Sequence, residues 1–281
     1  MESKREKHYK ERKRPVTLRE TRFEWFRSLT LPVLFFRSLM LPVMFFLLSL
    51  PSVTGRSVKT PAEVKVTARV ELLNSRVKAR NGKIDASGVV VWLESIEGEG
   101  PRGPRTRQKI LQLGKRFKPH VMAVERGTEV YFPNLDPFFH NVFSLYEGKR
   151  FDLGLYASGE TRPVVFNRLG ISYIFCNIHP RMSAIVVTVA TPYFATSDEE
   201  GAVTINNVPE GYYQLKIWHE RTSDEELAAQ SRAVRVAAGA AGGYDLGVIR
   251  LNEAGYMLQP HKNKHGGQYD NEHSKPSYKR Q

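Results

Sequence analysis

The sequence predicts an all-β protein made of two β-sandwiches. From residue 61 on, the chain consists of short segments rich in β-branched and aromatic residues, such as the alternating VKVTARVELL at 64–73. Gly, Pro, Asp and Asn interrupt these segments at short intervals, a pattern typical of sandwiches and barrels. Only SDEELAAQ, at 223–230, has the character of a short helix.

Residues 1–60 differ from the rest because they carry 13 Lys and Arg against 5 Asp and Glu. They contain a tandem duplication in which RSLTLPVLFF, 27–36, is followed by RSLMLPVMFF, 37–46. The apolar run 38–50 has the length of the hydrophobic part of a signal peptide, and small residues follow it where a peptidase could cut. We therefore expect 1–55 to be a basic region with a signal peptide. The protein would be exported to the periplasm or cell envelope, or secreted.

An uncleaved membrane anchor over 29–50 is the alternative for this segment. Arg37 in the middle of that span, and the two prolines within it, are unfavourable in a bilayer. No cysteine follows the apolar run, so a lipid-anchored lipoprotein is not expected. Membrane attachment, if the segment stays uncleaved, would be through this span.

Composition limits the function classes. The net charge of +13 is concentrated in the two ends of the chain, so no nucleic-acid-binding face is expected on the folded part. Apolar residues make up 41% of the sequence, which is enough for a buried core. The single cysteine, Cys176, excludes an intrachain disulfide, a zinc ribbon and a copper pair bridged by two thiolates.

The predicted strands fall into three blocks. The first, 62–96, holds the alternating strand and the β-branched GVVVWLE. A loop rich in Gly, Pro and Arg, 98–108, leads to the second block, 108–190, whose segments are KILQL, HVMAVE, TEVYFPN, NVFSLY, RPVVFN, SYIFCN and AIVVTVA. The third, 191–251, has two strands around a Pro-Glu-Gly turn, then RAVRVAA and YDLGVIRL. Residues 252–281 are rich in Lys, His, Gly, Gln and Ser, and we expect a disordered tail.

One octapeptide, FCNIHPRM at 175–182, holds the thiol of Cys176, the imidazole of His179 and the thioether of Met182. A soft thiolate beside an imidazole and a thioether favours copper over zinc or magnesium. A blue-copper site needs a second imidazole, with methionine as a long axial ligand. His140 is the candidate, because it ends a turn of Pro, Asn and Asp and begins a predicted strand.

The second block resembles a cupredoxin. The string F-x-P…V-x-x-G-T-x-V-x-F-x-N-x-D-P-F-x-H-N-V, from Phe117 to Val142, is similar to the plastocyanin and amicyanin pattern, and C-x2-H-x2-M has the short amicyanin spacing. The resemblance implies a Greek-key β-sandwich in which Asn141 ties the two ligand loops together and helps to orient the sulfur. It also implies that one Cu(I)/Cu(II) ion is bound by His140, Cys176, His179 and Met182.

The residues around these ligands indicate where a redox partner protein would dock. Phe138, Phe139 and Pro180 would form an apolar docking surface, and Arg181 would add a charge at its edge. Pro180 also stiffens the loop and removes a backbone donor from it.

No enzymatic activity is expected. Multicopper oxidases and copper nitrite reductases need further histidines, typically in His-x-His pairs or next to the cysteine. This chain has no His-x-His, and Cys176 is flanked by Phe175 and Asn177. A copper ion with four protein ligands leaves no open position for a substrate.

The third block has a resemblance of its own. Residues 196–218, with the pattern T-x4-G-x3-I-x2-V-P-x-G-x-Y-x-L, resemble the second half of a carboxypeptidase-regulatory-like, transthyretin-type β-sandwich. We expect the cupredoxin to be inserted in this sandwich, or followed by it; on insertion, 62–96 and 191–251 would be its halves. The combined layout resembles bacterial methylamine-utilisation proteins.

The sequence thus predicts an exported type 1 (blue) copper protein that carries single electrons between redox partners. One alternative is a non-redox protein of the cell envelope, either a copper-binding module or an adhesion or scaffold module. Another is a redox subunit that feeds a dehydrogenase or an oxidase. A reversible one-electron couple with an intense visible band would distinguish the electron carrier from the non-redox protein.

Overall fold

The computed structural model describes residues 62–98, 100, 102–103, 106–145, 147–239, 242–254, 262–267 and 269. The predicted signal peptide or anchor lies outside these residues. Within the part of the chain that is described, no helix combines the length and the apolar character needed to cross a bilayer.

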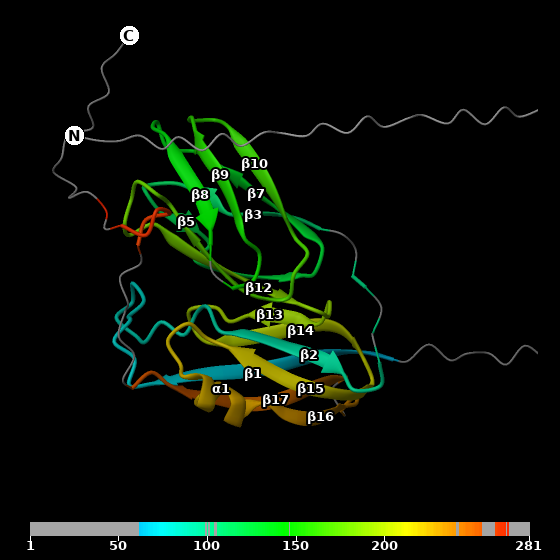
Figure 1. Ribbon diagram of the computed structural model, residues 1–281. Coiled ribbons are helices and arrows are strands. Elements are labelled where there is room, and N and C mark those ends of the chain that lie inside the picture. Colours follow the sequence, from blue (N-terminus) through cyan, green and yellow to red (C-terminus); the bar gives the residue numbers. More distant parts are fainter. Residues whose placement is uncertain are drawn as a thin grey trace, which may run out of the picture. The chain divides into compact units, whose positions relative to one another are not determined.

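Nearly all regular structure in the described chain is β-strand, which confirms the predicted all-β class (Figure 1). The strands form two sandwiches. We call the one formed by strands within 63–95 and 194–252 the split sandwich, and the one formed by strands within 107–189 the inserted sandwich.

The split sandwich has one sheet in the order β14–β1–β17 and another in the order β13–β2–β15–β16. Its strands are β1 (Glu63–Leu73), β2 (Val90–Ser95), β13 (Phe194–Thr196), β14 (Ala202–Pro209), β15 (Gly211–Trp218), β16 (Arg232–Val236) and β17 (Gly243–Asn252). β1 pairs antiparallel with β14 and parallel with β17, while β2 pairs antiparallel with β13 and β15. Backbone hydrogen bonds therefore join the strands that precede the inserted sandwich to those that follow it.

The one helix among the described residues is α1 (Asp224–Gln230), which lies between β15 and β16 in the chain. It begins at Ser223, whose hydroxyl accepts a hydrogen bond from the backbone N–H of Glu226 at 3.3 Å. Acidic residues fill its first turn, where the helix dipole favours negative charge. Its Leu227 is buried in the core of the split sandwich.

The inserted sandwich has a five-stranded sheet in the order β6–β12–β11–β8–β9 and a three-stranded sheet in the order β10–β7–β3. Its strands are β3 (Arg107–Lys109), β4 (Leu111–Gln112), β5 (Phe117–Lys118), β6 (Val121–Glu125), β7 (Thr128–Pro133), β8 (His140–Ser144), β9 (Phe151–Tyr156), β10 (Thr161–Phe166), β11 (Gly170–Phe175) and β12 (Ser183–Val189). The short strands β4 and β5 form a separate antiparallel pair.

The core of the inserted sandwich lies between its two sheets. Along β7, buried residues alternate with partly exposed ones, so that Val130 and Phe132 point inward. The ring of Phe132 contacts those of Phe117 and Phe151, at centroid distances of 6.5 and 6.0 Å. Cys176 belongs to the same buried cluster, so one end of this core forms the wall of the candidate site.

β12 is buried on both faces. Ala184 and Val186 pack in the core of the inserted sandwich, whereas Ile185, Val187 and Val189 pack in the core of the split sandwich. A strand that is covered on both sides needs apolar residues on both faces, and every residue of AIVVTV except Thr188 is apolar. The two sandwiches therefore share this strand.

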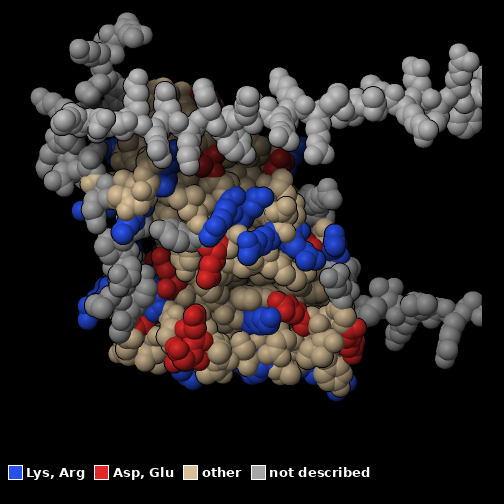
Figure 2. All heavy atoms as spheres, viewed as in Figure 1, with Lys and Arg blue, Asp and Glu red and all other residues tan. Residues whose placement is uncertain are grey.

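Charged side chains of both signs cover the surface. On the face drawn in Figure 2, Lys and Arg side chains gather over the inserted sandwich, and Asp and Glu side chains are spread over both sandwiches.

Candidate metal centre

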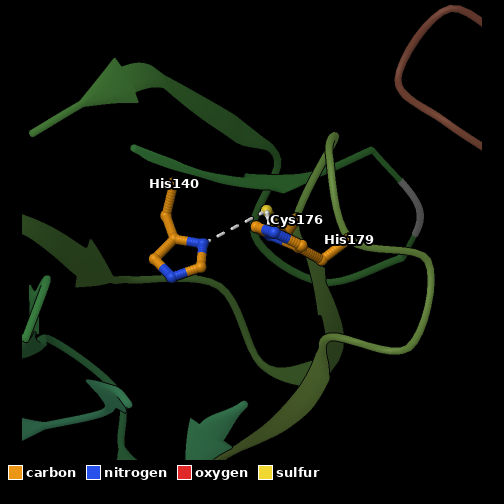
Figure 3. Close-up of side chains that lie close together, drawn as sticks. All are labelled: His140, Cys176 and His179. Carbon is orange, nitrogen blue, oxygen red and sulfur yellow. Dashed lines mark hydrogen bonds between the residues drawn. The ribbon is translucent and has the colours of Figure 1, made fainter. Parts of the chain in front are cut away.

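Strand pairing brings together three of the residues that the sequence singled out. β8 runs antiparallel to β11 with Phe143 opposite Phe175, so the start of β8 lies beside the residue that follows β11. His140 is the first residue of β8 and Cys176 is the first after β11. His140, Cys176 and His179 place their ligand atoms within 4.8 Å of one another (Figure 3).

The imidazole of His140 is fully buried and is held at both nitrogens. Its Nε2 lies 2.8 Å from Oδ2 of Asp136, and its Nδ1 lies 3.8 Å from the sulfur of Cys176. The carboxylate favours the tautomer with hydrogen on Nε2, which leaves the Nδ1 lone pair facing the sulfur. A carboxylate that accepts from the outer nitrogen is the usual support of a metal-binding histidine.

Asp136 is held in turn by the turn between β4 and β5. Its two carboxylate oxygens accept hydrogen bonds from the backbone N–H groups of Gly114, at 2.7 Å, and Lys115, at 2.9 Å. Burial by itself would raise the pKa of Asp136, but the hydrogen bonds from Lys115, His140 and Gly114 outweigh it and lower the pKa overall. Asp136 is therefore an ionised partner for the imidazole.

His179 approaches the sulfur from the ligand loop, residues 176–182. Its Nδ1 lies 3.6 Å from the sulfur of Cys176, and its ring centroid lies 4.9 Å from that of His140. The ring of Phe138 contacts both imidazoles, at centroid distances of 5.2 and 5.7 Å. His179 is only partly buried, so it is the histidine of the cluster that reaches the surface.

The thiol of Cys176 lies in the apolar core cluster of the inserted sandwich. Its side chain is fully buried, and burial raises its pKa. Backbone N–H groups that point at the sulfur oppose this shift; they belong to Asn141, Ile178 and His179. A metal ion that binds this sulfur displaces the proton, because the thiolate is the form that acts as a ligand.

Met182 closes the ligand loop. Its side chain is fully buried and belongs to the same core cluster as Cys176. The backbone N–H of Met182 donates to the carbonyl of His179 at 3.0 Å, and that of Cys176 donates to the carbonyl of Met182 at 3.1 Å. These two bonds hold the loop as a tight turn between β11 and β12.

The donor set fits a metal ion. Metal–nitrogen and metal–sulfur bonds of about 2.0–2.3 Å that meet at about 110–120° place nitrogen and sulfur roughly 3.6–3.8 Å apart. The two sulfur–nitrogen distances here are 3.6 and 3.8 Å. Two imidazoles and one thiolate are the equatorial donors of blue-copper sites.

The backbone and the side chain of Asn141 make different contacts at the site. Its backbone N–H points at the sulfur, but its side-chain amide donates to Asp152 at 2.8 Å and not to the ligand loop. Its side-chain oxygen is buried without a hydrogen-bond partner among the described residues. The side chain thus connects the site to β9.

Part of the C-terminal segment lies on the ligand loop. The hydroxyl of Tyr269 donates to the carbonyl of Cys176 at 2.9 Å, and the backbone N–H of Lys264 donates to the side-chain oxygen of Asn177 at 2.9 Å. The ammonium of Lys264 also lies 2.9 Å from the carboxylate of Asp152. The composition of 252–281 gave no indication of these contacts.

Among the predicted docking residues, Phe138 contacts the ring of His179, and Pro180 and Arg181 follow it in the chain. Phe138 and Phe139 are 37% and 50% exposed, which is high for large apolar side chains. Arg181 is exposed and Pro180 is partly buried. The ammonium of Lys115 lies 5.7 Å from the ring centroid of Phe138.

No family model matches the chain, and no curated protein matches it. Among solved structures, a purple cupredoxin from Nitrosopumilus maritimus is 23% identical over 29% of this chain and 99% of its own, with a TM-score of 0.27. A reduced amicyanin variant is 19% identical over 34% of this chain and 97% of its own, with a TM-score of 0.28. A copper-containing nitrite reductase from Thermus scotoductus is 19% identical over 43% of this chain and 28% of its own, with a TM-score of 0.29. These similarities concern the fold alone.

Proposed function

We propose that this chain, whose cupredoxin-like sandwich carries a His-Cys-His cluster, is a type 1 copper protein that transfers single electrons. The observation that carries the proposal is the convergence of two imidazole nitrogens and one thiol sulfur within 4.8 Å. His140, Cys176, His179 and Met182 would bind one copper ion. The bound ion would supply a one-electron change between Cu(I) and Cu(II).

The protein's own contribution is to hold the donors still. Asp136 fixes the ring of His140, and the two backbone hydrogen bonds within the ligand loop fix Cys176 and His179 relative to Met182. Burial keeps water away from the sulfur. A site that keeps the same ligand positions in both oxidation states reorganises little when an electron enters or leaves.

The partly buried edge of His179 would be the exit for the electron. The exposed ring of Phe138 contacts His179. Together with Pro180, Arg181 and the exposed Phe139, it would supply the docking surface. Four protein ligands leave no position for a substrate, which supports a carrier and not an enzyme. We also propose that the protein acts outside the cytoplasm, because the sequence of 1–55 resembles an export segment.

The visible and paramagnetic-resonance spectra of the full chain loaded with Cu(II) test this proposal. We expect an intense band from thiolate-to-copper charge transfer and a reversible one-electron couple. Cys176→Ala should abolish the band, whereas His120→Gln, which changes a histidine outside the cluster, should leave it intact. A colourless, redox-silent complex would favour the non-redox copper-binding protein, and identical spectra for wild type and Cys176→Ala would refute the site.

A further inference from the structure

A cleft of about 530 Å³ lies beside the candidate metal centre. His179 forms part of its wall, and the turn between β4 and β5 forms another part. Four basic side chains line it: Lys115, Arg116, Lys118 and Arg181. All four are exposed, and none makes an ion pair with a described residue.

The positive charge of this cleft is not neutralised by acidic side chains that line it. Among the described residues that line it, none carries a carboxylate. Asp136, which lies behind the turn, already accepts from two backbone N–H groups and from His140. His120 also lines the cleft, but its Nε2 is engaged with Glu220 at 2.9 Å and its Nδ1 lies 3.1 Å from the carbonyl of Ser183. Four unpaired cations therefore face one concave surface.

We propose that this basic cleft docks an acidic face of the redox partner protein and so holds that partner against the edge of His179. This inference rests on the proposed function and names the chemistry of the partner. Complementary charge raises the rate of encounter and suppresses wrongly charged partners, at a cost in salt sensitivity. The apolar rings of Phe138 and Phe139 would then form the dry part of the same interface.

A protein surface fits the cleft better than a small anion does. A site for phosphate or a carboxylate metabolite is built from buried donors that converge on one point, whereas these four side chains are all exposed and extend into solvent. The ammonium of Lys115 lies over the exposed ring of Phe138, which joins the basic and apolar surfaces. A polar, charged rim around exposed aromatic side chains is the usual composition of a protein–protein interface.

An oligoglutamate peptide serves as the probe for an acidic partner, and its binding to the metal-free full chain is measured by fluorescence anisotropy. We expect binding at low salt that weakens as salt is added. The triple variant Lys115→Glu, Lys118→Glu, Arg181→Glu should bind about tenfold more weakly or worse, because three attractive charges become repulsive.

The matched control makes the same change in net charge elsewhere. Lys78→Glu, Arg80→Glu, Lys83→Glu alters three exposed basic residues between β1 and β2, outside the cleft, and should bind the peptide almost like wild type. Equal loss in both triple variants would mean that only net charge matters and would overturn the proposal. Binding of inorganic phosphate in the cleft, without binding of the peptide, would also overturn it. The assay needs no copper, so it can fail while the copper assignment stands.

A different observation supports a second inference, about the C-terminal segment. Residues 262–267 and Tyr269 make three hydrogen bonds to the site's surroundings, and one of them reaches the carbonyl of the cysteine itself. Lys264 contacts Asp152, which in turn accepts from Asn141, the neighbour of His140. The segment thus contacts the loop that carries Cys176 and the residue that supports β8.

We infer that this segment is a strap that immobilises the ligand loop. Tyr269 and Lys264 are positioning residues, because their hydrogen bonds go to a backbone carbonyl and to side chains next to the ligands. Their removal should leave the fold intact and loosen the loop.

Amide hydrogen exchange of the metal-free full chain tests the strap. In the double variant Tyr269→Phe, Lys264→Gln, we expect the amides of residues 176–182 to exchange several-fold faster, while those of β15 in the split sandwich keep their rates. Copper loading of the same variant should broaden the paramagnetic-resonance spectrum, because the ligands sample more arrangements. Unchanged exchange across 176–182 would overturn the inference whether or not the chain binds copper.

Discussion

Both units are β-sandwiches, but their buried polar groups have different partners. In the split sandwich several of these groups bond to the backbone. The hydroxyl of Ser197, for example, donates to the carbonyl of Ala86 and accepts from the N–H of Val89. In the inserted sandwich, the imidazoles of His140 and His179 face the thiol of Cys176, each with a nitrogen directed at the sulfur.

This difference distinguishes polar groups that complete the fold from polar groups that could bind a ligand. A hydroxyl that satisfies two backbone groups completes the fold and has no capacity left for a ligand. Soft and basic atoms that point at a common centre are costly to bury without a further partner, and they are kept where that partner is a metal ion. The comparison leads to four predictions, from the largest expected effect to the smallest.

The strand that both sandwiches share offers the strongest test of whether they are separate units. Ile185 is 1% exposed and packs in the core of the split sandwich although it belongs to the inserted one. Ile185→Ala should lower the free energy of unfolding by about 2–5 kcal/mol. Denaturant unfolding followed by Trp fluorescence should give one transition that shifts as a whole. Val165→Ala, at an exposed position on β10, should shift it little; two transitions that separate in Ile185→Ala would show that the sandwiches unfold independently.

Acid should weaken the split sandwich through His219. Burial, together with the nearby charge of Arg221, lowers the pKa of His219 to about 4. Between its ordinary pKa of about 6.5 and this value, the unfolded chain binds a proton that the folded chain does not, so stability falls as the pH falls. Between these two pH values the free energy of unfolding falls by about 3 kcal/mol. His219→Gln should have a flatter dependence of unfolding free energy on pH, and an unaltered slope would contradict the assignment.

Removal of the carboxylate behind His140 should weaken metal binding without removing a ligand. Asp136→Ala frees the imidazole to rotate and to change tautomer, and we expect copper affinity to fall about 10–100-fold. Competition with a copper chelator measures the effect. Glu160→Ala, at the exposed Glu160–Arg162 pair of the same sandwich, is the control and should bind copper like wild type. Equal affinities in the two variants would mean that Asp136 has no part in the site.

The pair His120–Glu220 joins the two sandwiches and should contribute least. The hydrogen bond to Glu220 raises the pKa of His120 against the effect of burial; the same bond lowers the pKa of Glu220, which burial would raise. The contribution of His120 to the free energy of unfolding is present below its ordinary pKa and is lost as the pH rises through its raised pKa. The contribution of Glu220 is lost as the pH falls through its lowered pKa. Because the side chain of His120 is 46% exposed, we expect an interaction energy of only about 0.2–1 kcal/mol for this pair. A double-mutant cycle with His120→Gln and Glu220→Gln measures this coupling, and it should vanish at alkaline pH.

The candidate ligands could be predicted from the sequence, whereas most of the residues that hold them in place could not. Cys176, His179 and Met182 stand within one loop, and His140 follows an Asp-Pro turn, so residue type and spacing were enough to choose them. Asp136 could also have been found, because it stands four residues before His140 in that turn.

The more distant supports could not have been found in this way. Lys264 stands 112 residues after Asp152, and Tyr269 stands 93 after Cys176, in a segment whose composition resembles a disordered tail. Contacts between residues so far apart in the chain leave no local pattern in the sequence. The fold was more accessible, since alternation and turn residues mark individual strands. The apolar run Ala184–Val187 of β12 also agrees with burial on both faces.

That doubly buried strand begins at Ser183, immediately after Met182. No hinge separates the ligand loop from the split sandwich, so whatever holds the split sandwich in place also fixes the direction in which the edge of His179 faces. With the split sandwich attached to a surface, the candidate metal centre would keep one orientation and would not rotate freely.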